Sequence, residues 1–297
     1  MRTNLLLIII SATILGSCGK KDKLPVDQPQ IPFQLQQVEH KDGIILFQYN
    51  SDNQLLKVEQ KTPSETAGLE TTQYTNFMYE NGLLHQAEYF LKVGSSFFKR
   101  TTYKYELDAQ KRIAYVARTF FYNNGNMIRK DTVEYTFNMY NKLVGVEFSG
   151  ENYHGYTYDS HGNYMPKDED ARHENELYSF RYESRYDYYQ NPFAVNNLGI
   201  YLFSVYLDDS PFSFNQLLSA ANPVYAKTII ETKELDGTGH PISSSENSYI
   251  SEYTNAFDPF GGIKQAGLKY SYQRKENGNI VAGYTEQSDL KFTCIKK

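Results

Sequence analysis

The sequence has 297 residues, of which 30 are basic and 35 acidic, so it lacks the excess of positive charge that nucleic-acid binding requires. It contains 27 tyrosines and 18 phenylalanines but no tryptophan. Tyrosine suits a pleated surface that is apolar on one side and wet on the other, and few segments have helical periodicity. The composition therefore predicts an all-β protein.

The chain begins with a segment typical of a secretory signal, in which a basic residue, a short apolar run and small residues follow one another. The apolar run is too short to cross a bilayer as a helix. The ending Leu15-Gly16-Ser17-Cys18 resembles the lipobox of bacterial lipoproteins. This resemblance implies that residues 1–17 are removed and that Cys18 carries the lipid. The alternative is a plain secretory signal with an ordinary thiol at Cys18.

Residues 18–32 are expected to form a flexible tether. From Gly19 to Pro32 the chain has three lysines, three prolines and no aromatic residue, so it cannot bury enough apolar surface to fold. Gly19 after the cysteine resembles lipoproteins that are sent on to the outer membrane. The resemblance implies a lipid-anchored protein of the cell envelope, most simply in the outer membrane.

A loose repeat fills the next part of the chain, with anchor tyrosines at positions 49, 79, 105, 135 and 158. Each copy reads as a strand ending in Tyr-x-Tyr or Phe-x-Tyr, a turn rich in Asn and Gly, and a second strand. In one copy Val133, Tyr135, Phe137 and Met139 are expected to share a face. Hairpins in series predict an antiparallel meander that forms either a curved sheet or a soluble up-and-down barrel.

The segment Tyr158-Asp159-Ser160-His161-Gly162-Asn163 resembles the YD repeat of Rhs-type wall and toxin-shell proteins. In other copies Asn50, Glu80 or Glu106 stands in the Asp position. The chain as a whole is similar to Bacteroidetes-type β-rich lipoproteins of unknown function, especially at residues 186–193 and 209–212. That similarity implies a porin-like β fold in a single YD-repeat-like domain over residues 33–297. It implies no activity and no catalytic residue.

The second half of the chain departs from the repeat. Asn191-Pro192 is a turn or helix-start signal, and Ser210 with Pro211 predicts one short helix over 211–221 that closes a barrel end or covers a sheet edge. Cys294 is expected to be a small buried residue. The predicted strands here are Lys227–Leu235, Ile242–Tyr253, Leu268–Arg274, Ile280–Thr285 and Leu290–Ile295.

No sequence pattern for catalysis is present: there is no nucleophile elbow, HExxH helix or phosphate-binding loop. Residues 154–174 combine histidines with carboxylates, which suits metal ions, but a solvated turn is the favoured interpretation, so no metal and no cofactor are predicted. The side chains concerned are His154, Asp159, His161, Asp168, Glu169, Asp170, His173 and Glu174.

Tyrosines beside arginines suggest a recognition surface for a glycan or a peptide, formed by Tyr182, Tyr186, Tyr188 and Arg185. Cross-strand packing is the alternative for each tyrosine. We expect a non-enzymatic binding or scaffold lipoprotein with no nucleic-acid partner. One alternative is an envelope glycan hydrolase that uses scattered carboxylates such as Asp168, Glu169 and Glu174. The other is an integral outer-membrane β-barrel.

Overall fold

The computed structural model describes residues 33–64, 68–149, 152–206, 214–258 and 262–296. The predicted signal, Cys18 and the tether lie outside these residues. Residues 31–297 make up one compact unit. No helix within the described ranges is both long and apolar enough to cross a membrane.

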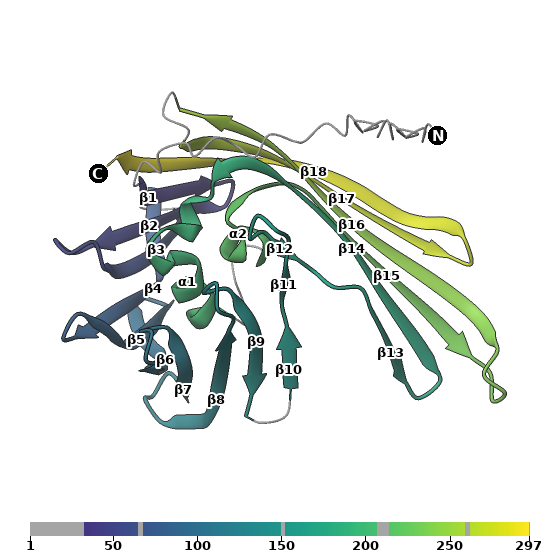
Figure 1. Ribbon diagram of the computed structural model, residues 1–297, viewed down its shortest axis with the longest axis horizontal. Helices are drawn as coiled ribbons and strands as arrows, with labels where there is room; N and C mark the ends of the chain where they lie inside the picture. The colour runs from purple at the N-terminus through teal and green to yellow at the C-terminus, as the bar shows by residue number, and fades with distance from the viewer. Residues whose placement is uncertain (1–32, 65–67, 150–151, 207–213, 259–261, 297) are drawn as a thin grey trace, which may run out of the picture. The chain divides into compact units, whose positions relative to one another are not determined.

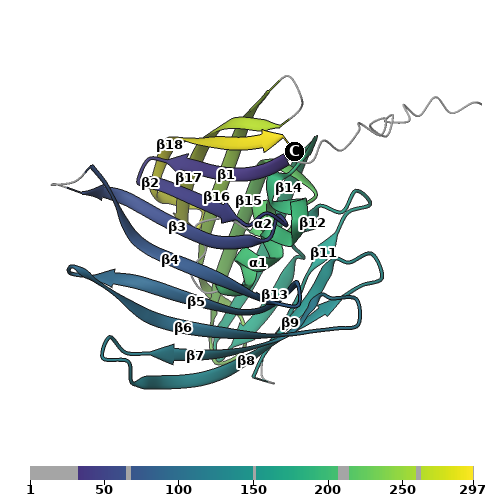
Figure 2. The ribbon, with the colours of Figure 1, turned by 90° about the vertical axis from the view of Figure 1, so that its left-hand side faces the viewer.

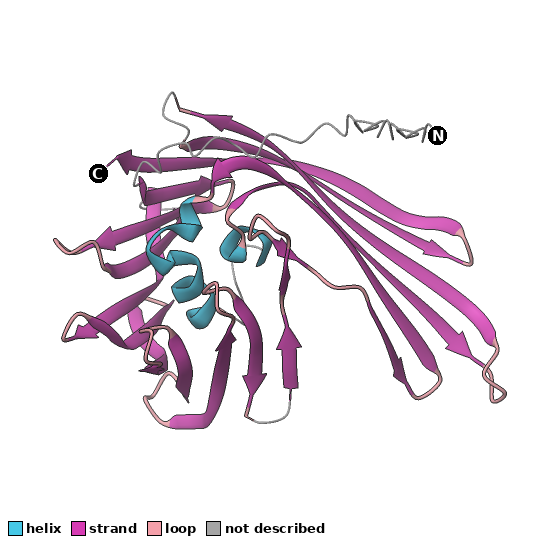
Figure 3. Cartoon of the chain, in the orientation of Figure 1, coloured by secondary structure: helices cyan, strands magenta, loops and turns pink. Residues whose placement is uncertain are grey.

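Strands dominate the described residues, as the composition predicts (Figure 3). Each strand up to the tenth pairs with the next one along the chain. These strands are β1 Phe33–His40, β2 Gly43–Tyr49, β3 Leu55–Ser64, β4 Gly68–Glu80, β5 Leu83–Val93, β6 Ser96–Leu107, β7 Ile113–Phe121, β8 Met127–Phe137, β9 Leu143–Phe148 and β10 Asn152–Gly155.

Among the later strands, those after residue 220 are longer than the sequence predicts. The predicted last strand, Leu290–Ile295, is not separate: it is the end of a continuous strand that begins at Asn279. The strands after β10 are β11 Thr157–Tyr158, β12 Tyr164–Met165, β13 Glu169–His173, β14 Glu176–Gln190, β15 Ala221–Leu235, β16 Pro241–Phe257, β17 Ile263–Glu276 and β18 Asn279–Lys296.

Sixteen of these strands form one antiparallel sheet, which confirms the predicted meander (Figures 1 and 2). The strand order runs from β10 back to β1, then to β18 and on to β13. The first and last strands pair, with Leu35 opposite Cys294. β10 and β13 are the two ends of the sheet, and β11 and β12 pair separately. Of the two predicted forms, the hydrogen-bonded order corresponds to the open sheet.

A repeated five-residue turn explains the Asp position of the repeat. In one copy the Asp159 N–H donates to the Asn163 carbonyl, and Asp159 Oδ1 accepts the N–H groups of His161 and Asn163 at 2.8 and 2.9 Å. The fourth residue, Gly162, has positive φ. A short side-chain acceptor is needed at the first position, because it satisfies two N–H groups that the tight turn leaves without a backbone partner. The same turns begin at Asn50, Asp108, Asn138 and Asp236.

This turn corrects the alignment of two copies. The repeat predicts Glu106 in the Asp position, but the side chain that caps the turn is Asp108, two residues later. Met139 was placed on the buried face, but it lies in the next such turn and is 85% exposed. Glu80 is followed by a two-residue turn in which Asn81 and Gly82 both have positive φ, as the Asn-Gly pair predicts.

The core lies on one face of the sheet, here called the inner face, which carries Tyr103, Tyr105 and Ala266. The first two of these and Tyr135 are buried, so the repeat tyrosines contribute to the core as their alternation predicts. Cys294 is partly buried against the same core. Burial, and to a lesser extent the charge of Asp258, raises the pKa of its thiol to about 12, so the thiol stays protonated.

A helical segment between β14 and β15 packs against the inner face (Figures 1 and 3). It consists of a 3₁₀ helix η1 Pro192–Asn197, α1 Leu198–Val205 and α2 Phe214–Leu218. Pro192 starts the first helix as predicted, and α2 falls within the predicted helix 211–221. α1 covers the inner face of the sheet, whereas the expected role of the 211–221 helix in closing a barrel end or covering a sheet edge stays a prediction. Tyr103 donates to the Val205 carbonyl at 2.8 Å.

Candidate ligand-binding site

The four predicted ligand-contact residues lie on β14, with Arg185 on a different face from Tyr182 and Tyr186. The Tyr186 hydroxyl donates to the Tyr164 carbonyl, and Tyr182, four residues earlier on the same strand, is partly buried. Arg185 lies on the opposite face, because side chains alternate along a strand, and stacks over the Tyr225 ring at 4.1 Å. Tyr188 is 75% exposed. Ligand contact by these four side chains stays a prediction.

The histidines and carboxylates of residues 154–174 are also dispersed. Asp159 caps a turn, Asp168 Oδ1 accepts the Tyr182 N–H at 2.9 Å, and Asp170 pairs with Arg181 at 2.8 Å. Glu169 and Glu174 are exposed, the latter in the β13–β14 turn. Among the described residues, no three His, Cys, Asp or Glu side chains come close enough to hold a metal ion.

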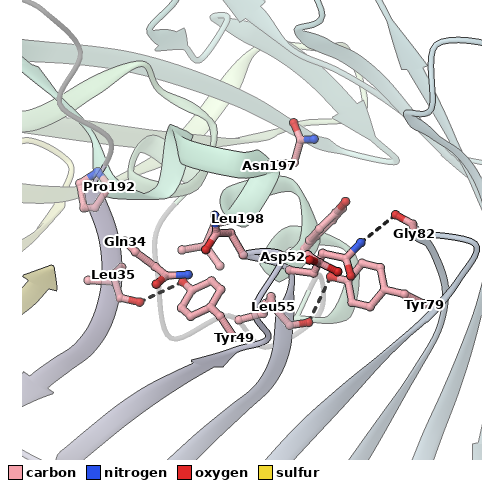
Figure 4. Close-up of a pocket in the computed structure, with 13 residues that line it drawn as sticks. Gln34, Leu35, Tyr49, Asp52, Leu55, Tyr79, Gly82, Pro192, Asn197 and Leu198 are labelled. Atoms are coloured by element: carbon pink, nitrogen blue, oxygen red, sulfur yellow. Dashed lines mark hydrogen bonds between the residues drawn. The ribbon is translucent and has the colours of Figure 1, made fainter. Parts of the chain in front are cut away.

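A cavity of about 330 Å³ lies between the sheet and the helical segment (Figure 4). It is bounded by the start of β1, the β2–β3 and β4–β5 turns, and the junction of η1 with α1. Its volume is within the range of small-ligand sites. The lining residues are Gln34, Leu35, Tyr49, Asp52, Asn53, Gln54, Leu55, Tyr79, Gly82, Pro192, Asn197, Leu198 and Tyr201.

A second hollow of about 350 Å³ is a weaker candidate. Its lining, within the described part of the chain, consists of neighbouring uncharged residues of β16, β17 and β18, among them Ser248, Ser271 and Thr285. Three adjacent strands of one sheet can form only a shallow depression, whereas the first cavity is walled by both sheet turns and helices. A ligand buries more of its surface in a site that is enclosed from several directions.

Two repeat tyrosines form the floor of the first cavity. Tyr49 donates to the Leu35 carbonyl at 2.9 Å and Tyr79 donates to the Leu55 carbonyl at 3.1 Å (Figure 4). Burial raises the pKa of both hydroxyls well above the ordinary value, with smaller contributions from Cys294 near Tyr49 and Tyr201 near Tyr79. Both hydroxyls therefore stay neutral, and each keeps oxygen lone pairs that can accept a ligand donor.

The turns fix the polar rim of the cavity. Gln54 Nε2 donates to the Gly82 carbonyl at 2.8 Å, and Gln54 Oε1 accepts from Asn50 at 2.8 Å, so one side chain joins the two turns. Asn53 adopts positive φ at 65°, which asparagine tolerates better than most residues. These contacts hold the amides and the Asp52 carboxylate at the mouth of the cavity.

Gln34 carries the clearest chemical signal in the cavity. The residue is only 5% exposed, and its Nε2 is buried without a hydrogen-bond partner among the described residues. Its Oε1 accepts from Gln36 at 3.2 Å. An unmade hydrogen bond on a buried amide costs about 1–3 kcal/mol. Since Nε2 has almost no accessible surface, a ligand oxygen would recover this energy once the Gln34 side chain rotates toward the cavity. The cavity therefore combines aromatic faces, amide donors and one carboxylate.

Sequence reasoning missed this cavity, because its residues come from segments between positions 34 and 201. The anchor residues Tyr49 and Tyr79 and the Pro192 helix start were each recognisable. Nothing in the sequence indicates that α1 lies against the turns that follow those tyrosines.

No family model matches the chain, and no curated protein matches it. Among solved structures, it is similar to a porin-like protein from Bacteroides uniformis, with 14% identity over 88% of this chain and 98% of that chain and a TM-score of 0.48. A porin-like protein from Bacteroides vulgatus has 12% identity over the same shares and a TM-score of 0.34. A complex described as TcdB2-TccC3-Cdc42 has 8% identity over 83% of this chain and 17% of that chain, with a TM-score of 0.20. None of these similarities carries a function to this chain.

Proposed function

We propose that the chain is a non-enzymatic, lipid-tethered binding protein of the cell envelope, and that its cavity holds the hydroxyl-rich end of a glycan. The unpaired Nε2 of Gln34 supports the proposal, because a rotation of this lining side chain into the cavity would pair Nε2 with an oxygen acceptor of the ligand. Tyrosine rings and amide groups around it suit sugar rings, which present apolar faces and hydroxyl groups that both donate and accept.

The lining supports binding rather than hydrolysis. Glycoside hydrolysis by the common mechanisms requires two carboxyl groups roughly 5–10 Å apart. Among the described residues that line the cavity, Asp52 is the single carboxylate. The scattered carboxylates of the hydrolase alternative, Asp168, Glu169 and Glu174, lie elsewhere, on or beside the exposed strand β13. A glycan held in this cavity would be bound and released unchanged.

The face of the sheet opposite the inner face argues against an integral membrane barrel. On β15–β17 it carries ion pairs, Lys269 with Glu252 at 2.8 Å and Lys275 with Glu246 at 2.8 Å. Charged side chains facing lipid near the bilayer centre cost about 2–4 kcal/mol for Arg or Lys. The lipobox and the lysine- and proline-containing tether instead support anchoring through Cys18, with the folded part outside the bilayer. Cys18→Ser should then release the protein from membranes, and retention in the membrane would favour the integral barrel.

The ligand proposal is tested with the chain that starts at Gly19, which contains the whole compact unit. The chain is screened on glycan and peptide arrays, and each hit is measured by calorimetry. Gln34→Met, which keeps the side-chain length, is expected to weaken glycan binding about tenfold, because one hydrogen bond to the ligand is lost. The same variant should be no less stable to urea, because it removes an unpaired buried amide.

Tyr188→Leu is the matched control, since Tyr188 is exposed and lies outside the cavity. It should leave glycan affinity unchanged. If Tyr188→Leu abolishes binding while Gln34→Met does not, the ligand binds on the β14 surface and not in the cavity. Binding of peptides alone would reject a glycan as the ligand.

A further inference from the structure

The strand β13 is an open edge of the sixteen-stranded sheet. It pairs with β14 on one side, and no described strand pairs with its other side (Figure 1). All five side chains, Glu169, Asp170, Ala171, Arg172 and His173, are exposed. An open edge presents unpaired backbone N–H and C=O groups, so it is either protected against other strands or used to bind one.

The charges along β13 are ordered so that the strand complements itself. Its first two residues are acidic, Ala171 is central, and Arg172 and His173 follow. In an antiparallel pair of two copies centred on Ala171, Asp170 lies opposite Arg172 of the second copy, and Glu169 lies opposite His173. Opposed residues of an antiparallel pair share a face, so these side chains meet. An in-register parallel pair would instead place like charges together.

Charges on an edge strand often prevent pairing with another strand, but the order of the charges on β13 differs from that protective pattern. Protective charges, typically lysines, repel a second copy in either direction, whereas the order on β13 attracts one in the antiparallel direction. The opposite edge, β10, has the sequence Asn-Tyr-His-Gly and no such order. Arg181 already donates to Asp170 Oδ1 at 2.8 Å and to the Glu169 carbonyl at 3.1 Å. A carboxylate has two oxygens, so Asp170 can accept from a second arginine as well.

We propose that two copies of this chain form a dimer by antiparallel pairing of residues 169–173 about a two-fold axis at Ala171. The same surface is used on both copies, so the contact closes and does not propagate into a fibre. The sheet becomes continuous through both copies. This inference does not depend on the glycan proposal, because β13 lies outside the lining of the cavity.

The first test is a site-specific crosslink in the chain from Gly19, with Cys294→Ser to remove the remaining thiol. Ala171→Cys brings the two introduced thiols opposite each other, where cross-strand Cβ atoms are about 4.5–5.5 Å apart, close to disulfide geometry. We expect mild oxidation to give a covalent dimer at least about tenfold faster than with Ala282→Cys. Ala282 is also exposed, but it lies on β18, away from the edge. Equal crosslinking rates for the two variants would overturn the proposal.

The second test measures self-association by sedimentation velocity. Asp170→Arg and Arg172→Asp each place like charges opposite one another twice in the dimer, so each should raise the dissociation constant at least about tenfold. The double variant D170R/R172D restores opposite charges and should associate like the unmodified chain. Circular dichroism checks that all variants stay folded. A monomer at every concentration would overturn the proposal, and so would a dimer whose dissociation constant is unchanged by the single charge reversals. Binding of a foreign peptide to the edge would not alter either conclusion.

Discussion

Replacing Gly199 by alanine tests how α1 is packed. Gly199 lies inside α1, where a glycine normally lowers helix stability by about 1 kcal/mol relative to alanine. From sequence alone the substitution is therefore stabilising. In the structure a Cβ at this position would lie 2.0 Å from the Leu217 carbonyl oxygen and 3.0 Å from that of Phe193. Both are backbone atoms, which cannot rotate away as a side chain can.

The expected loss of stability follows from the distance between the added Cβ and the Leu217 carbonyl oxygen. Ordinary contact begins at 3.4 Å, so α1 and α2 would have to separate by about 1.4 Å. Overpacking of this kind costs about 1–3 kcal/mol or more. Here it acts on a largely buried helix that itself contributes Leu202 and Phe203, both 0% exposed, to the core. After subtracting the gain in helix propensity, we expect Gly199→Ala to lower the free energy of unfolding by about 2 kcal/mol.

Urea unfolding of the chain from Gly19, followed by far-ultraviolet circular dichroism, measures this change. With an m-value of about 3 kcal/mol/M, the midpoint should fall by about 0.7 M. Gly237→Ala is the matched control, because a Cβ there meets no atom within 4 Å, and it should change stability by less than about 0.5 kcal/mol. A Gly199→Ala midpoint equal to or above that of the parent chain would refute the close packing of α1 on α2.

Two further substitutions test the core hydrogen bonds and the repeated turn. Tyr103→Phe removes the hydroxyl that donates to the Val205 carbonyl, which lies in the last turn of α1 and has no partner within the helix. Urea unfolding should therefore show a free energy of unfolding lower by about 1–2 kcal/mol. The control Tyr140→Phe changes an exposed residue and should cause almost no loss. Asp159→Ala removes the acceptor of two turn N–H groups and should cost about 1 kcal/mol, whereas Asp159→Asn keeps an acceptor and should cost less. Burial acts to raise the pKa of Asp159, but hydrogen bonds from the Asn163 backbone and side chain and from the His161 backbone outweigh it and lower the pKa. The ionised form of Asp159 therefore stabilises the fold above the ordinary pKa of about 4, and this contribution is lost as the pH falls through the lowered pKa of the folded state. The difference in unfolding free energy between the parent chain and Asp159→Asn should disappear in acid. A difference that stays constant with pH would contradict this assignment.

Local chemistry was sufficient to predict the strands and most turns. Alternation at Val133 and Tyr135 identifies a half-buried strand, and both residues are buried as expected. The pair Asn81-Gly82 specifies a two-residue turn, because both residues tolerate positive φ. The tyrosine spacing predicts Glu106 at the Asp position, but the turn begins at the capping side chain of Asp108. Asp108 is a capping residue type, but Lys111, unlike Asn141 or Gly162 in the other turns, does not signal the positive φ that it adopts.

Contacts between distant segments decided the features of the fold that the sequence did not predict. The sequence determined an antiparallel meander with a tyrosine-bearing buried face, because strand alternation and turn chemistry act over a few residues. The tertiary structure decided that β1 pairs with β18, that β13 is left as an edge, and that α1 lies against the inner face. α1 has no capping side chain and is largely buried, so its helical state depends on packing rather than on local signals. The cavity around Gln34 exists for the same reason, since its walls come from segments that meet only in the folded protein.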